Sequence, residues 1–163
     1  MIILGIDPGY ATTGFGIIKF NGDEAKPLDF GVITTEKGLP HGERIRQTVS
    51  DLLSLVKEHR PDAIAMEELF FSKNTKTALK VAESRGAILY ALGCQNQLPT
   101  EYKPNQIKMN ICGYGSAPKI QVQKMVQLLL NLKSIPYPDD AADALAIALC
   151  HHNHQKTNIN IEQ

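Results

Sequence analysis

The stretch IILGIDPG (Ile2–Gly9) decides the fold that we expect for this chain. Apolar or small residues lead directly to Asp7, so the segment is typical of a short buried strand that ends in a tight Asp-Pro-Gly turn. Gly9 allows a sharp turn and leaves the backbone open to a ligand. A carboxylate at the end of a buried strand is costly unless something compensates its charge. Asp7 is therefore a candidate functional residue, although an Asp before Pro-Gly also suits a simple turn.

Outward from this strand, short apolar runs alternate with segments of helical periodicity, without a repeat or a linker that would split domains. We expect strands near residues 2–6, 14–20, 28–34, 63–66 and 98–102, and helices near 45–56, 73–95, 104–111, 118–129 and 139–150. Ser116 is a possible cap for the helix that begins at Pro118. This order predicts an α/β fold, with a mixed five-stranded sheet flanked by helices on both faces. Residues 1–155 form one expected domain, and residues 156–163 an expected frayed tail.

Three further carboxylates lie where stability alone does not explain them. Glu67 ends a second buried strand, and strand alternation gives it the same place in its strand as Asp7 has in the first. If the two strands are neighbours, both acids reach one edge of the sheet. Asp140 and Asp143 are three residues apart and share one face of the last helix. Alanines around them would let that helix approach the sheet closely. Taken singly, each could be an ordinary strand-end or helix-start acid.

Such a group of acids predicts a metal site. Two carboxylates about 4 Å apart repel by roughly 4 kcal/mol at an effective dielectric near 20. Hard divalent cations with oxygen ligands relieve this repulsion, so we expect Mg²⁺, or Mn²⁺ as an alternative. Two such ions can activate water and stabilise the leaving oxygen of a phosphodiester.

The charge distribution indicates a polyanionic partner, although the net charge is zero. Residues 73–133 carry nine Lys or Arg and only two Asp or Glu, whereas both flanking segments are acidic. Residues 113–116, Gly-Tyr-Gly-Ser, lead to a helix start that carries Lys119, a plausible cradle for phosphate. Lys108 lies on the preceding short helix. Phe70 is core by default, but beside the site it could stack on bases or contact a partner.

The amino-acid composition excludes several classes of protein. Three scattered cysteines argue against a disulfide framework or a zinc site and favour a reducing cytoplasm. No apolar run approaches the roughly 18 residues of a membrane span. His151, His152 and His154 suggest a metal site, but we expect a solvated helix end.

In this order, the motifs resemble the RuvC family of bacterial Holliday-junction resolvases over almost the whole chain. The matching segments are Gly5–Gly9 with Thr13–Gly16, Ala65–Phe70 with Lys73, Asn74 and Ala78–Lys80, Arg85-Gly86, Gly113–Ala117 with Lys119, and Asp140–Ala146. The first segment alone would also suit ATPases of the actin and sugar-kinase superfamily, but one domain of 163 residues is too short for their two-lobed cleft.

The resemblance implies an RNase H-like fold and a homodimer that makes paired, metal-dependent nicks across a four-way DNA junction. Its catalytic and metal-binding acids would be Asp7, Glu67, Asp140 and Asp143, with about two ions per subunit. Its DNA-binding positions would be Phe70, Lys73, Lys108 and Lys119. The branch-migration proteins RuvA and RuvB are implied partners. Asp139 leaves open which of two neighbouring acids binds metal.

Two alternatives remain at this stage. An RNase H-like nuclease that acts on structured or precursor RNA would keep the acidic site, but it need not recognise branched DNA. A junction-binding module without catalysis would bind regardless of metal and leave no nicked product.

Overall fold

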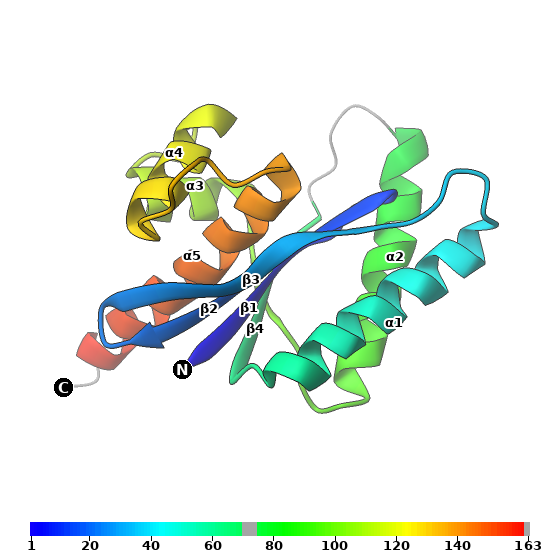
Figure 1. The fold of residues 1–163 in the computed structure, drawn as a ribbon, viewed down its shortest axis with the longest axis horizontal. Helices are drawn as coiled ribbons and strands as arrows, with labels where there is room; N and C mark the ends of the chain where they lie inside the picture. Colours follow the sequence, from blue (N-terminus) through cyan, green and yellow to red (C-terminus); the bar gives the residue numbers. More distant parts are fainter. Residues whose placement is uncertain (70–74, 162–163) are drawn as a thin grey trace.

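The computed structural model describes residues 1–69 and 75–161 and contains one mixed five-stranded sheet, in the order β3-β2-β1-β4-β5 (Figure 1). The three N-terminal strands are antiparallel, whereas β4 and β5 run parallel to the central β1. The strands are β1 (Ile2–Asp7), β2 (Thr12–Asn21), β3 (Glu24–Thr34), β4 (Ala63–Glu67) and β5 (Thr100–Tyr102). The hairpin expected at Asn21-Gly22 joins β2 to β3, with Gly22 at a positive φ of 59°.

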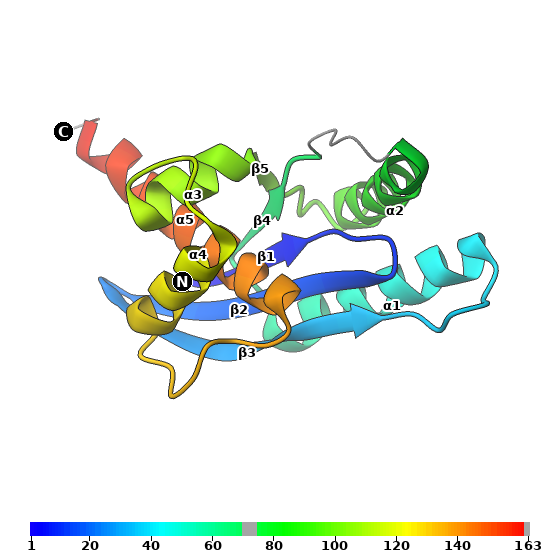
Figure 2. The same ribbon diagram turned by 90° about the horizontal axis from the view of Figure 1, so that it is seen from above.

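Five helices cover both faces of this sheet, as the sequence predicts. They are α1 (His41–His59), α2 (Thr75–Gly93), α3 (Pro104–Cys112), α4 (Lys119–Leu129) and α5 (Asp139–Ile161). In Figure 1, α1 and α2 lie on the right of the sheet and α3, α4 and α5 on its left. Figure 2 shows α5 crossing the strands behind α3 and α4.

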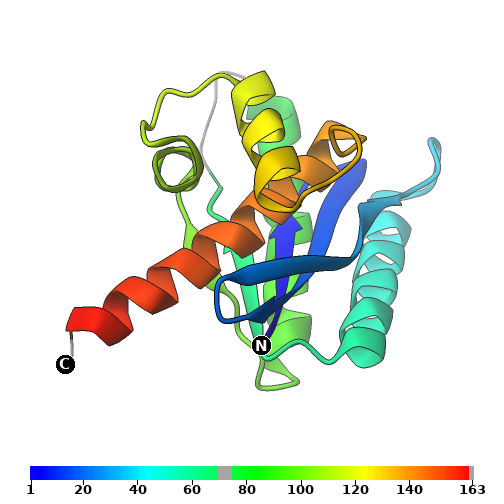
Figure 3. The same cartoon turned by 60° about the vertical axis from the view of Figure 1, so that its left-hand side comes forward.

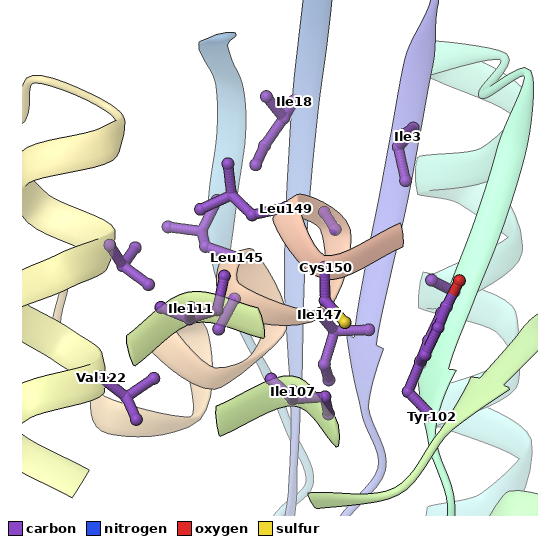
Figure 4. Close-up of a cluster of buried hydrophobic side chains, with 14 of the residues drawn as sticks. Ile3, Ile18, Tyr102, Ile107, Ile111, Val122, Leu145, Ile147, Leu149 and Cys150 are labelled. Carbon is purple, nitrogen blue, oxygen red and sulfur yellow. The ribbon is translucent and has the colours of Figure 1, made fainter. Parts of the chain in front are cut away.

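Strand alternation divides the core into two layers. Leu4 and Ile6 of β1 pack toward α1 and α2, whereas Ile3 packs into the cluster around α5. Figure 4 shows this second cluster, in which Leu145 and Ile147 of α5 meet Ile107 of α3. The two layers bury most large apolar side chains and hold the strand ends in fixed positions.

Glycines in the sheet let α5 lie unusually close to it. A Cβ atom at Gly5 would stand 2.0 Å from the carbonyl oxygen of Ala144, and one at Gly14 would stand 2.1 Å from that of Asp140. Alanines of α5, including Ala141 and Ala144, are fully buried on the facing side. Any larger side chain in this seam would push the helix away, so backbone contact fixes the height of the first turn of α5.

The structure corrects three details of the sequence prediction. The last helix does not end near Cys150 but continues to Ile161, so the expected frayed tail is helical up to that residue (Figure 3). His151 and His152 are buried, so this part of α5 is not a solvated helix end. Pro118, not Ser116, occupies the cap position of α4, and no side chain caps that helix. Tertiary contacts with Phe20 and Tyr102, which a local pattern does not reveal, hold the histidines inside.

Among residues 1–69 and 75–161, no helix combines the length and the apolar character that crossing a membrane requires.

Candidate active site

Asp7 and Glu67 end two neighbouring parallel strands. The register pairs Gly5 with Ala65 and Ile6 with Met66, so the next residue of each strand reaches the same edge of the sheet. Glu67 is also paired in register with Tyr102 of β5. The expected neighbourhood of the two strands is therefore confirmed, and it brings the two carboxyl groups together from segments 60 residues apart.

The first turn of α5 brings Asp140 and Asp143 to this edge. Gly14 lies opposite Asp7 in the sheet and touches the backbone of Asp140, which places the helix start directly over the end of β1. The close seam between glycines and alanines thus has a consequence for the site: it sets the height of the two helical acids above the strand acids.

Burial and repulsion from neighbouring carboxylates disfavour ionisation of Asp7, Glu67 and Asp143 in the absence of a cation. Burial raises the pKa of Asp7 well above its usual value, and the charges of Glu67, Asp143 and Asp140 raise it further. Burial, followed by the charge of Asp143, raises the pKa of Glu67 to about 7. The pKa of Asp143 is also raised by burial, against the opposing effect of Lys119. Perturbed carboxyl groups in a cluster are typical of functional sites.

Two lysines predicted to bind DNA lie close to these carboxyl groups. Lys119 Nζ is 2.8 Å from Asp139 Oδ2 and 2.8 Å from Asp143 Oδ2. Burial lowers the pKa of Lys119, but the ion pairs outweigh burial and the pKa is raised above its usual value. Lys108 lies near enough to Glu67 for its charge to lower the pKa of that carboxyl group. Both ammonium groups therefore face the acids.

The two neighbouring acids at the start of α5 have different surroundings. Asp139 is exposed, and its hydrogen bond with Lys119 lowers its pKa. Asp140 is half-buried, and its charge acts on Asp7. The sequence does not decide which of these two acids belongs to the site. In the structure, Asp140 lies near the strand acids, whereas Asp139 forms an ion pair with Lys119. The sequence offers no signal for the Lys119–Asp139 pair, because the two residues lie on different helices.

A cavity of about 370 Å³ opens at this edge of the sheet. Glu67 and Asp143 line it together with Lys108 and Lys119, and apolar side chains such as Ile107 form its other wall. The cavity thus combines anionic and cationic groups beside an apolar surface, an arrangement that suits a phosphate diester with its attached sugar.

The donor set fits a hard divalent cation. The four carboxylates offer only oxygen ligands, and the raised pKa values of Asp7, Glu67 and Asp143 report negative charge that still lacks compensation. Within the described residues, no group of three or more His, Cys, Asp or Glu residues is arranged to hold a metal ion as it stands. Lys119 instead bridges Asp139 and Asp143 and supplies part of the positive charge. The predicted DNA-binding residues Phe70 and Lys73 lie outside the described residues.

Comparisons with known proteins give a consistent result. The family model described as crossover junction endodeoxyribonuclease RuvC matches residues 3–151. A curated protein of that name from Chloroflexus aurantiacus is 52% identical over 152 residues, which cover 93% of this chain and 92% of its relative.

Solved structures agree with the sequence relatives. A Thermus thermophilus RuvC structure superposes with a TM-score of 0.89 at 35% identity and covers 97% of both chains. The T. thermophilus protein in complex with a Holliday junction substrate gives a TM-score of 0.90 at the same identity, over 97% of this chain and 96% of the other. This similarity confirms the predicted RNase H-like fold.

Proposed function

The chain belongs to the RuvC family of crossover junction endodeoxyribonucleases, and on that premise we propose that it resolves Holliday junctions by cutting DNA strands at the crossover. The observation that carries the proposal is the meeting of four carboxylates from β1, β4 and α5 at one edge of the sheet, where two of them line a cavity together with Lys108 and Lys119. The T. thermophilus relative has been solved with a Holliday junction substrate, which supports the same substrate class for this chain.

We propose that Asp7, Glu67, Asp140 and Asp143 hold Mg²⁺, or Mn²⁺ in its place, with two ions per subunit during the reaction. When bound, such ions supply Lewis acidity toward water and toward the scissile phosphodiester. The carboxylates contribute by being ionised and by standing in fixed positions at the ends of rigid elements. Because Asp7 and Glu67 have raised pKa values, cation binding and loss of their protons are linked.

The lysines have a separate task. Lys108 and Lys119 keep positive charge at the mouth of the cavity, where it attracts and orients the phosphate of the DNA backbone. Lys119 also holds Asp143, so it links phosphate binding to the position of one acid. This division assigns cutting to the acids and binding to the basic residues.

Paired nicks need two active sites related by symmetry, and we propose a homodimer. Leu79 and Tyr90 of α2 are 66% and 76% exposed, and their spacing places both on one side of that helix. An exposed apolar helix side supports burial against a second copy. We further propose RuvA and RuvB as partners. We also propose a cytoplasmic location, because all three cysteines are free thiols, namely Cys94, Cys112 and Cys150.

The two alternatives are not favoured. An RNA-directed nuclease would keep the acids, but the relatives are named for DNA crossover junctions. A binding module without catalysis would not require four carboxylates that repel one another beside the DNA.

Cleavage of a labelled synthetic four-way junction tests the proposal. Linear duplex and RNA/DNA hybrid of the same sequence serve as controls, each with Mg²⁺, with Mn²⁺ and with a chelator. We expect symmetric nicks confined to the junction and lost with the chelator. Cleavage of the RNA-containing substrate alone, or junction binding without any cleavage under either metal, would refute the proposal.

Metal binding has a test that does not depend on cleavage. Addition of Mg²⁺ to the protein without DNA is expected to raise the midpoint of thermal unfolding, because a cation relieves repulsion only in the folded state. Asp7→Asn should lose most of this shift. An equal shift in both proteins would mean that the ion binds elsewhere.

A further inference from the structure

A second charged cluster lies across the Asp7–Gly9 turn from the carboxylates. The ring of Tyr10, just after the turn, is flanked by two cations: Arg44 Cζ is 4.4 Å from the ring centroid and Lys80 Nζ is 4.7 Å from it. Lys80 Nζ also donates to the Tyr10 hydroxyl over 3.3 Å. Three elements meet here, and Figures 1 and 2 both show the β1–β2 turn beside α2 and near the start of α1.

The arginine of this cluster is held rigidly. Its side chain is buried, and its Nε donates to the hydroxyl of Thr35 over 2.8 Å. Thr35 follows β3 and in turn donates to the backbone of Ala11 in the same turn as Tyr10. The guanidinium is therefore fixed in position before any ligand arrives, which reduces the entropy cost of binding.

Neither cation has an anionic partner in the part of the chain that the structure describes. Among the described side chains, no carboxylate lies within ion-pair distance of Arg44 or Lys80. The acid one turn further along α2, Glu83, bonds His41 instead, at 2.5 Å. Cation–π contact offsets only about 0.5–2 kcal/mol of the cost of a buried charge. The pKa of the Tyr10 hydroxyl is lowered, first by the hydrogen bond from Lys80, which reports the uncompensated positive charge.

We propose that Arg44, Lys80 and the Tyr10 hydroxyl form a second phosphate-binding site, which holds the DNA backbone one to three nucleotides away from the cleaved phosphate. The inference rests on the proposed function, because it takes junction DNA as the ligand. Tyr10 follows Asp7 by three positions, so their Cα atoms lie at most about 11 Å apart. A DNA strand carries one phosphate about every 3.4 Å of helix axis, so a strand entering the acid site can present a phosphate here.

The proposed site gives Arg44 and Lys80, on this side of the turn, a role in DNA binding. The acids face α5, whereas the cluster faces α1 and α2, so a backbone that crosses the sheet edge is held on both sides of the Asp-Pro-Gly turn. Two fixed phosphates define the direction of the strand, and one alone does not. A purely structural role would account for Arg44, which ties α1 to the turn, but not for the exposed Lys80.

Lys80→Gln tests the site, with Lys26→Gln as its matched control. Both lysines are exposed, and Lys26 lies near the β2–β3 turn at the far end of the sheet. Binding of a labelled four-way junction is measured in chelator over a series of salt concentrations. We expect Lys80→Gln to weaken binding about three- to tenfold and to reduce the slope of log affinity against log salt by about one. Lys26→Gln should leave both unchanged, with equal unfolding midpoints for the two variants.

Uncharged DNA phosphates then locate the contact. A methylphosphonate is placed singly at positions one to three nucleotides from the cut. We expect wild-type affinity to fall at one of these positions and Lys80→Gln to show no further loss there. Equal losses in both proteins, or salt slopes equal to that of Lys26→Gln, would overturn the site while leaving the resolvase proposal intact. Absence of any preference of the wild-type protein for junction over duplex would count against the proposed function instead.

Discussion

The two ends of α5 bury titratable groups in opposite ways. At its N-terminal end, carboxyl groups of α5 face those of two strands, and burial raises the pKa values of Asp7 and Asp143. Toward its C-terminal end, burial lowers the pKa values of His151 and His152. His151 shares a hydrogen bond of 2.9 Å with the Tyr102 hydroxyl, and His152 stacks on Phe20 at 3.9 Å between ring centroids.

Perturbed pKa values occur at both ends of α5, but only the acid end carries uncompensated charge. Both ends carry perturbed groups, so a shifted pKa alone does not identify the active site. At the histidine end, His151 has hydrogen-bond partners in Tyr102 and Gln155. His152 only stacks on Phe20, and its buried ring nitrogens have no hydrogen-bond partner among the described residues. Burial there favours neutral rings, which need no counter-ion. At the acid end, like charges remain together with only partial compensation from Lys119, which supports our proposal that a cation binds there. The contrast can be tested by disturbing each end in turn.

The largest expected effect comes from the seam that positions the acid end. Gly14→Ala would place a Cβ atom 2.1 Å from the Asp140 carbonyl oxygen, so α5 must shift. We expect a loss of about 3 kcal/mol in the free energy of unfolding, together with loss of cleavage. Denaturant unfolding and junction cleavage measure the two. Gly42→Ala is the control, because a Cβ atom there meets nothing within 4 Å. Equal stability of both variants would contradict the close seam.

The next effect distinguishes the two neighbouring acids. Asp140→Asn should lower the cleavage rate by more than about 100-fold, equivalent to about 2.7 kcal/mol, because it removes a proposed metal ligand. Asp139→Asn removes only a partner of Lys119 and should cost less than about tenfold. Single-turnover cleavage of a four-way junction measures both rates. The reverse order would assign the metal role to Asp139.

The free energy of unfolding, measured without metal over a range of pH, distinguishes the two ends of α5, because its pH dependence has opposite signs at the acid end and the histidine end. The pKa of Glu67 is about 7 in the folded state and 4.5 in the unfolded chain. Its contribution to stability is therefore present below pH 4.5 and is lost as the pH rises through about 7. Glu67→Gln removes this loss and should raise the free energy of unfolding at pH 8 by on the order of 2–3 kcal/mol. No gain at pH 8 would contradict the raised pKa of Glu67.

The smallest effect is expected at the histidine end. The folded-state pKa of His152 is lowered by burial, so its contribution is present above pH 6.5 and is lost as the pH falls through the folded pKa. His152→Phe keeps a ring on Phe20 and removes the group that must stay neutral. We expect the acid limb of the stability curve to flatten by about 1 kcal/mol or less, while cleavage at pH 8 stays unchanged. A loss of cleavage would mean that the two ends are coupled.

The sequence predicts the acid end well, because strand ends and helix spacing are local patterns. Asp7 and Glu67 each follow a buried strand, and parallel pairing brings them to one edge. Helical spacing alone predicts that Asp140 and Asp143 lie on one face of the last helix.

The histidine end and the lysine bridge could not be predicted in this way. Burial of His151 depends on Tyr102, and the ion pairs of Lys119 depend on how α4 packs beside α5. The cluster of Tyr10, Arg44 and Lys80 gathers residues from three elements and has no signature in any one of them. These are tertiary contacts, and only the assembled fold reveals them.

We propose that the four carboxylates are needed for cleavage and the basic residues for DNA binding, and Asp7→Asn separates these two roles. The affinity of this variant for a four-way junction is measured in chelator, and its cleavage rate is measured in Mg²⁺. The account predicts affinity within about threefold of wild type and cleavage reduced by more than about 100-fold. Parallel loss of binding and cleavage, or cleavage that persists in the variant, would contradict it.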